Sequence, residues 1–117
     1  MPLVKKKYIL RFRAVNQDIF NAIKNGKKKV ETRAATARYN KIKVGDVIIL
    51  VCGKNKFKKT VKRARIFKTI RSMLEKYKVK DIMPNLLSAK ELERAYYGYP
   101  NYRQKIKKFG LIALELK

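Results

Sequence analysis

A run of six apolar residues, Val47–Cys52, restricts the fold more than any other part of the sequence. It follows the turn-forming stretch Val44-Gly45-Asp46 and precedes Gly53-Lys54-Asn55-Lys56. A short apolar run between two turn signals is typical of a buried strand. Glycine and asparagine directly after it favour a hairpin. The sequence therefore predicts a buried strand that a hairpin joins to a second strand, residues 57–67.

Three further segments have the two-residue alternation of strands: residues 7–13, 28–34 and 111–116. In residues 28–34, strict alternation puts Val30 and Thr32 on one face and Glu31 and Arg33 on the other. The apolar residues of 57–67 change phase partway along the segment. A bulge near Lys62-Arg63 would restore a single apolar face, and bulges suit small closed barrels.

Short amphipathic segments separate these strands. One helix is expected from an N-cap at Asn16 to Gly26, a second after a cap at Thr69, and a third after Ser88, which has capping-box spacing to Glu91. Residues 102–108 add one or two more helical turns. The sequence predicts an α+β fold of about five strands and three or four short helices, in a single domain over residues 1–117.

The charge of the chain is extreme. Lys and Arg number 32 against 8 Asp and Glu, a formal net charge of +24, while 46% of the residues are hydrophobic. That apolar content indicates a folded body rather than a basic tail. Self-repulsion of this size is relieved by a polyanion, so nucleic acid is the expected partner. An anionic membrane surface is the alternative, but no apolar helix or lipidation signal supports it.

Several other classes of site are disfavoured by what the sequence lacks. Histidine is absent, which removes His-based triads and zinc sites that need imidazole. Cys52 is the sole cysteine and lies in the apolar run, so we expect a buried, inert thiol. No metal or cofactor is expected, and no protein partner can be predicted. Without a signal peptide or spanning segment, we expect a soluble, cytoplasmic protein, or a nuclear one if the source is eukaryotic.

The stretch from Gly26 to Arg33 holds the main candidate site. Glu31, one of the few acids, stands among Lys27, Lys28, Lys29 and Arg33. It can hold neighbouring cations in fixed directions or act as a polar group in a cleft. The alternative is that Glu31 only relieves like-charge repulsion on an exposed strand. Spacing alone leaves the two interpretations equally weighted.

Four motifs in order give the chain a family resemblance. Residues 26–33 fit the pattern G-x-K-x-x-E-x-R, and Val44-Gly45-Asp46 precedes an apolar strand. Phe67-Lys68-Thr69 followed by Met73-Leu74, and then Phe109-Gly110-Leu111-Ile112-Ala113, complete the series. Over roughly residues 10 to 116 the chain resembles ASCH domains.

The resemblance implies a PUA-like fold, a small β-barrel flanked by helices, that binds RNA in a cleft beside the barrel. It would place Lys28, Glu31 and Arg33 at that cleft. One enzymatic branch of the family removes the acyl group of acetylated cytidine with a Lys, a Thr three residues later and a distant Glu. Lys28 matches the lysine, but Glu31 stands where the threonine would be. Thr32 comes one place later, on the opposite strand face, so no catalytic residue is assigned. Lys28 and Glu31 are the candidates if the protein is an enzyme.

The leading hypothesis is an RNA-binding module, for single-stranded or structured RNA, with DNA not excluded. Tyrosines between arginines can stack on unpaired bases. Tyr96 is more simply explained as a side chain that packs over the barrel. Most single lysines are solvated surface charges, and a purely structural protein that compacts nucleic acid would need only the charge. Beyond Lys28, Glu31 and Arg33, the predicted RNA-binding residues are Arg38, Lys41, Lys43, Lys58, Lys62, Tyr99, Tyr102 and Arg103.

Overall fold

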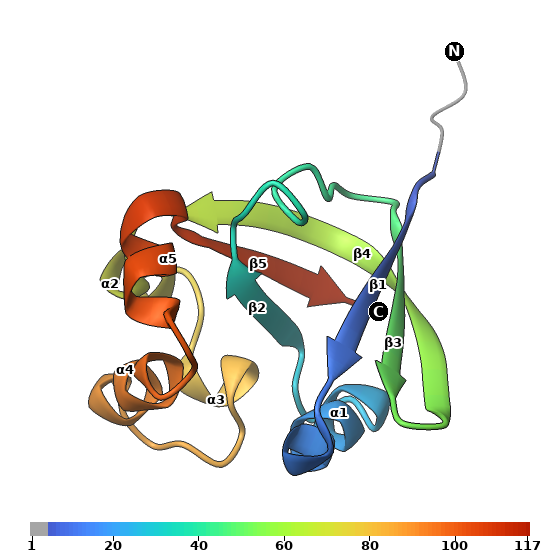
Figure 1. Ribbon diagram of the computed structural model, residues 1–117, viewed down its shortest axis with the longest axis horizontal. Helices are drawn as coiled ribbons and strands as arrows, with labels where there is room; N and C mark the ends of the chain where they lie inside the picture. Colours follow the sequence, from blue (N-terminus) through green and yellow to red (C-terminus); the bar gives the residue numbers. More distant parts are fainter. Residues whose placement is uncertain (1–4) are drawn as a thin grey trace.

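Five strands form one curved sheet in the order β1-β3-β4-β5-β2 (Figure 1). The computed structural model describes residues 5–117. β1 runs parallel to β3, and the other neighbours are antiparallel. The strands are β1 (Lys7–Phe12), β2 (Val30–Ala34), β3 (Val47–Cys52), β4 (Asn55–Phe67) and β5 (Leu111–Leu116).

The long strand β4 gives the sheet its curvature. Its first part pairs with β3 and its second part with β5. The register shifts between Val61 and Arg63, so the predicted bulge is confirmed. A bulge bends and twists the strand that carries it. The sheet therefore curls into a half-barrel whose two edge strands are β1 and β2.

The helices lie on two sides of this sheet (Figure 1). α1 follows β1 through a 3-10 turn and lies below the ends of β1 and β2, whereas α2 to α5 gather beside β2 and β5. Their bounds are η1 (Ala14–Asn16), α1 (Gln17–Lys24), α2 (Ile70–Leu74), α3 (Val79–Ile82), α4 (Ala89–Tyr97) and α5 (Tyr102–Phe109). No helix within residues 5–117 has the length and apolar character needed to cross a membrane.

β5 separates two apolar clusters. Ile112 and Leu114 belong to the cluster inside the half-barrel, together with residues of β1, β3 and α1. Leu111 and Ala113 belong to the cluster beneath α2 to α5. All four side chains are fully buried. A strand covered on both faces contributes side chains to both clusters, so β5 connects the half-barrel to the helical layer.

The predicted α+β class and small five-stranded barrel are confirmed, the barrel being a half-barrel. The Thr69 cap is also confirmed, because its hydroxyl accepts from the Ser72 amide at 3.0 Å. Asn16 occupies the N-cap position but makes no side-chain cap hydrogen bond. α3 is a helix that the sequence pattern missed. The predicted domain includes residues 1–4, which lie outside the described residues.

Candidate functional site

The site lies where the two edges of the half-barrel approach each other. The Arg33 side chain of β2 reaches β1, where its Nη2 donates to the Arg11 carbonyl oxygen at 3.3 Å. Its guanidinium also lies over the Phe12 ring, 4.9 Å from the centroid. A planar cation suits both contacts at once. Arg33 thus joins β1 and β2, which are not neighbours in the hydrogen-bonded strand order.

Side chains occupy the free edge of β2. The Thr32 amide donates to Glu31 Oε1 at 3.1 Å, and the Ala34 amide donates to the Tyr102 hydroxyl at 3.1 Å. Edge amides left unpaired would attract another strand. The Thr32 and Ala34 amides, which another strand would use, are therefore already bonded, and the cavity lies beside this edge.

Glu31 is the centre of the charged group. Only 4% of the residue is exposed. Its Oε1 lies 3.4 Å from Lys28 Nζ, and its Oε2 accepts from Arg33 Nε at 3.2 Å. Lys28 also donates to the Ile82 carbonyl oxygen of α3. Lys28 reaches Glu31 because the strand begins only at Val30, so strict alternation does not hold at position 28.

The two cations respond differently to burial. Burial lowers the pKa of Lys28, although the neighbouring Glu31 carboxylate opposes this change. Burial also acts to lower the pKa of Arg33, but the Glu31 carboxylate together with Tyr39 and Tyr102 outweighs it and holds that pKa above its ordinary value. Arg33 is therefore a permanent positive charge, whereas Lys28 loses its proton more readily than a surface lysine.

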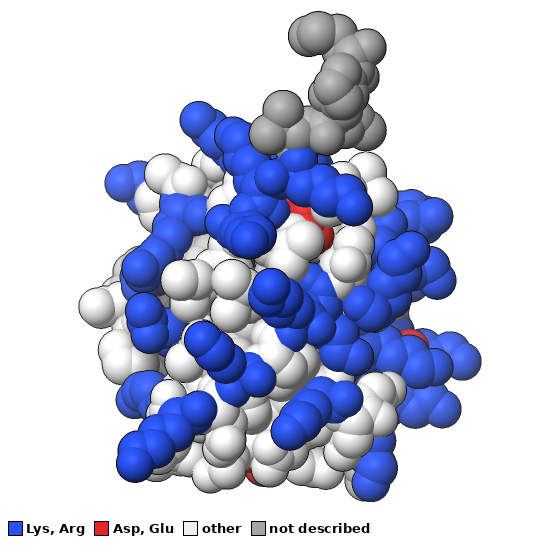
Figure 2. Space-filling model, turned by 90° about the vertical axis from the view of Figure 1, so that its right-hand side faces the viewer, with Lys and Arg blue, Asp and Glu red and all other residues white. Residues whose placement is uncertain are grey.

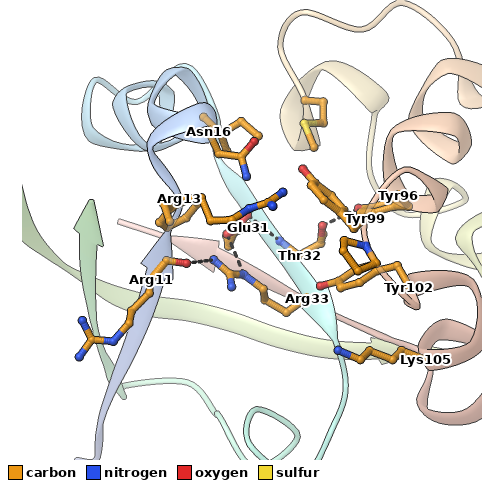
Figure 3. Close-up of a pocket in the computed structure, with 14 residues that line it drawn as sticks. Arg11, Arg13, Asn16, Glu31, Thr32, Arg33, Tyr96, Tyr99, Tyr102 and Lys105 are labelled. Atoms are coloured by element: carbon orange, nitrogen blue, oxygen red, sulfur yellow. Dashed lines mark hydrogen bonds and ion pairs between the residues drawn. The ribbon is translucent and has the colours of Figure 1, made fainter. Parts of the chain in front are cut away.

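A cavity of about 380 Å³ opens beside these residues (Figure 3). Glu31, Thr32 and Arg33 form its β2 wall, and tyrosines from α4, α5 and the loop between them form the opposite wall. The Tyr99 and Tyr102 rings meet edge to face at 5.3 Å. The complete lining is Arg11, Phe12, Arg13, Asn16, Ile19, Glu31, Thr32, Arg33, Met83, Tyr96, Tyr99, Pro100, Tyr102 and Lys105.

The cavity offers few but varied polar groups. Tyr96 is buried and its hydroxyl is bonded to the Thr32 hydroxyl. Burial raises the pKa of both Tyr99 and Tyr102, so their hydroxyls stay protonated at neutral pH. Across the described part of the chain, no three His, Cys, Asp or Glu side chains gather as metal ligands. One carboxylate, fixed cations and aromatic rings suit a planar organic ligand that carries an anionic group.

A second pocket of about 450 Å³ adjoins the cavity and shares Ile19, Met83 and Tyr99 with it. Lys28 lines this second pocket and not the cavity. Glu31 therefore separates the Lys28 ammonium from the cavity that Arg33 faces.

The predicted site residues fall into five places. Glu31, Arg33, Tyr99 and Tyr102 line the cavity, and Lys28 contacts Glu31 from behind. Arg103 lies in a separate surface pocket, where its guanidinium covers the Tyr97 ring at 4.7 Å. Arg38, Lys41 and Lys43 are exposed in the loop after β2, and Lys58 and Lys62 are exposed on β4.

Sequence reasoning missed the residues that β1, its following turn and α5 contribute to the cavity. These are Arg11, Phe12, Arg13, Asn16 and Lys105. Arg11 and Arg13 flank Phe12, but in a chain with 32 Lys and Arg two arginines close together do not stand out. Asn16 and Lys105 had no distinguishing pattern.

Comparison with known proteins gives two consistent results. The family model for the ASCH domain matches residues 14–117. The crystal structure of hypothetical protein PH0355 has 31% sequence identity and a TM-score of 0.81, covering 95% of this chain and 97% of that one. The solution structure of protein PF0455 from Pyrococcus furiosus has 30% identity and a TM-score of 0.70, covering 95% and 96%. None of the curated proteins compared with the chain matches it.

Proposed function

Because the chain belongs to the ASCH domain family, we propose that it binds RNA and seats one nucleotide in the cavity between β2 and the tyrosines of α4, α5 and their loop. The observation that carries this proposal is the Glu31 carboxylate, buried at the cavity wall and held between Lys28 and Arg33. A carboxylate held in this way has a fixed direction. It can accept a hydrogen bond from the exocyclic amine of a base.

The aromatic and basic lining supports the rest of the nucleotide. Tyr99 and Tyr102 offer rings on which a base can stack, each stack contributing about 1–3 kcal/mol. Arg13 and Lys105 line the same cavity and suit the phosphate. The net charge of +24 adds attraction for the polymer as a whole.

The choice of base provides a direct test. Cytosine has an amine where uracil has a carbonyl oxygen, and the two bases are otherwise alike in size. Facing a carboxylate, the amine donates and the carbonyl is repelled. We expect cytidine 5′-monophosphate to bind more tightly than uridine 5′-monophosphate, by about tenfold for one charge-assisted hydrogen bond.

Glu31→Gln should reduce this preference, because a side-chain amide accepts less strongly than a carboxylate and can also donate to uracil. Glu93→Gln, an exposed residue of α4, changes the net charge equally and serves as the control. Equal affinity for the two nucleotides in the unchanged protein would contradict the role given to Glu31.

The second candidate function is the removal of an acyl group from N4-acetylcytidine by Lys28. The observation in its favour is the lowered pKa of Lys28, which favours the nucleophilic amine. Two features weigh against it: Lys28 does not line the cavity, and the Thr32 hydroxyl is bonded to Tyr96. We therefore favour binding. Incubation with N4-acetylcytidine checks the choice, since release of cytidine that disappears in Lys28→Ala would establish the enzyme.

A further inference from the structure

The outer face of the half-barrel has a regular pattern of charge that the cavity does not use. Side chains that alternate with the buried ones point away from the core. We define the outer face by Lys7, Ile9 and Arg11 of β1, Val47, Ile49 and Val51 of β3, and Lys56, Lys58 and Thr60 of β4. Each of these residues is exposed or half-buried. No acid is among them.

Strand pairing fixes how these residues lie relative to one another. Three cross-strand rows result: Lys7, Val47 and Thr60; Ile9, Ile49 and Lys58; and Arg11, Val51 and Lys56. Neighbouring strands lie about 4.8 Å apart, so the cations of β1 and those of β4 form two lines about 10 Å apart. The aliphatic side chains of β3 lie between them. Figure 2 looks onto this side of the molecule, where blue side chains surround pale uncharged surface and few acidic atoms are visible.

The outer face is continuous with the cavity through Arg11. Arg11 lines the cavity, and its carbonyl oxygen accepts from Arg33. In Figure 3 its side chain points away from the cavity. A chain that leaves the cavity past Arg11 therefore meets the first line of cations on the outer face without crossing an apolar or acidic region.

We propose that the outer face is a second contact surface for RNA, along which the phosphates next to the nucleotide in the cavity are bound. This inference rests on the proposed function, and it adds the direction in which the bound strand runs. Two lines of ammonium and guanidinium groups bind a sugar–phosphate backbone without reading its sequence. The aliphatic groups of β3 offer the riboses an apolar surface between the lines.

The test compares two oligonucleotides and two triple variants. A cytidine trinucleotide is short enough to occupy mainly the cavity, whereas an oligocytidine of about 12 nucleotides extends onto the outer face. The face variant is K7Q/K56Q/K58Q, which leaves Arg11 in place. The control variant is K76Q/K78Q/K90Q, which removes equal charge from exposed positions near α2, α3 and α4.

For the longer oligonucleotide, the face variant should bind about tenfold or more weakly than the control variant at the same salt concentration. The slope of log affinity against log salt should fall by about two, since each single-strand phosphate contact contributes about 0.7. Both variants should bind the trinucleotide equally. Equal melting temperatures would show that both variants are folded.

Two results overturn the inference. One is equal weakening of the longer oligonucleotide by both variants, which would mean that only the total charge matters. The other is a loss of trinucleotide binding in the face variant as large as its loss of binding to the longer oligonucleotide. That result would place these lysines at the cavity. Failure of the proposed function has a different signature: trinucleotide affinity would be insensitive to Glu31→Gln in the otherwise unchanged protein.

Discussion

Two buried carboxylates, Asp46 and Glu31, differ in what surrounds them. Asp46 is 1% exposed and accepts from the amides of Lys6 at 3.1 Å and Lys43 at 3.0 Å. Glu31 is 4% exposed and, among residues 5–117, has a single main-chain partner, the Thr32 amide. Its other contacts are the side-chain cations of Lys28 and Arg33.

The difference lies in whether the partners of each carboxylate can be exchanged. Main-chain amides are fixed by the fold. Asp46 therefore secures a turn that joins three parts of the chain: the start of β1, the loop after β2, and strand β4. The Val61 amide and the Gly45 amide add main-chain bonds to the same turn. Glu31 is bound by side chains and lines a cavity, so a ligand can bind the groups around it. Burial alone therefore does not separate an acid that secures a turn from one that lines a cavity.

The largest expected effect comes from Asp46→Ala. It leaves two partly buried amides without an acceptor, beside a newly emptied buried position, and should lower the free energy of unfolding by about 2–3 kcal/mol. Urea denaturation measures the loss. Nucleotide affinity of the folded fraction should not change. Asp46→Asn retains one acceptor and should cost less, and a loss below about 1 kcal/mol in the alanine variant would remove Asp46 from this role.

Glu31→Gln should affect nucleotide affinity more than stability, the reverse of Asp46→Ala. The amide oxygen still accepts from Thr32, and Lys28 can release its proton, so we expect a loss of only about 1–2 kcal/mol in unfolding free energy. Affinity for cytidine 5′-monophosphate should fall by about tenfold. Urea denaturation and nucleotide titration on the same samples give both values. A stability loss as large as that of Asp46→Ala, with affinity unchanged, would make the two acids equivalent.

Arg33→Lys keeps the charge but removes the planar group that contacts Glu31, Arg11 and Phe12 together. One ammonium cannot reach the Arg11 carbonyl oxygen and cover the ring at the same time, so we expect a loss of about 1 kcal/mol in stability. Melting curves measure this loss, and nucleotide affinity should fall as well. Arg38→Lys, in the exposed loop, is the matched control. Identical behaviour of the two variants would show that Arg33 does not hold the strand edges together.

The smallest effect is a dependence of stability on pH. The pKa of Lys28 in the folded state lies below its ordinary value of 10.5. Between the two values the unfolded chain binds a proton that the folded chain has released, so stability rises with pH in that interval. Denaturation from about pH 7 to 10 should show a rise in the unchanged protein that is smaller in Lys28→Met.

Above pH 10 the tyrosines act in the opposite direction. Burial and the hydrogen bond to Glu115 raise the pKa of Tyr77 to about 12. The unfolded chain then loses a proton that the folded chain retains, so stability falls as pH rises from about 10. Measurements for Lys28 therefore belong below pH 10. A pH profile in Lys28→Met identical to that of the unchanged protein would mean that Lys28 is not protonated differently on folding.

Much of the fold could be predicted because its signals are local. The alternation of apolar residues located the strands, and the phase change in β4 located the bulge. α3 escaped prediction because it has four residues, and its N-cap residue Lys78 makes no side-chain cap hydrogen bond. Its helical geometry comes from packing Ile82 into the core beneath α2 to α5.

The candidate site was only half visible in the sequence. Glu31 and Arg33 form a recognisable spacing within one strand, and the tyrosines stand out by composition. Phe12, Asn16 and Lys105 come from segments that contact β2 only after the sheet has curled. No local sequence pattern indicates which two strand edges will face each other in the folded sheet.

The sequence by itself determined the strands, the helix caps, the excess of positive charge and the isolation of Glu31 among cations. These depend on neighbouring residues and on composition. Only the tertiary structure decided that Glu31 and Asp46 have different surroundings, that Lys28 lies outside the cavity, and that Lys56 and Lys58 of β4 lie across β3 from the cations of β1. Each of these depends on strand pairing or on how the sheet bends at β4, and both bring together residues that are far apart in the chain.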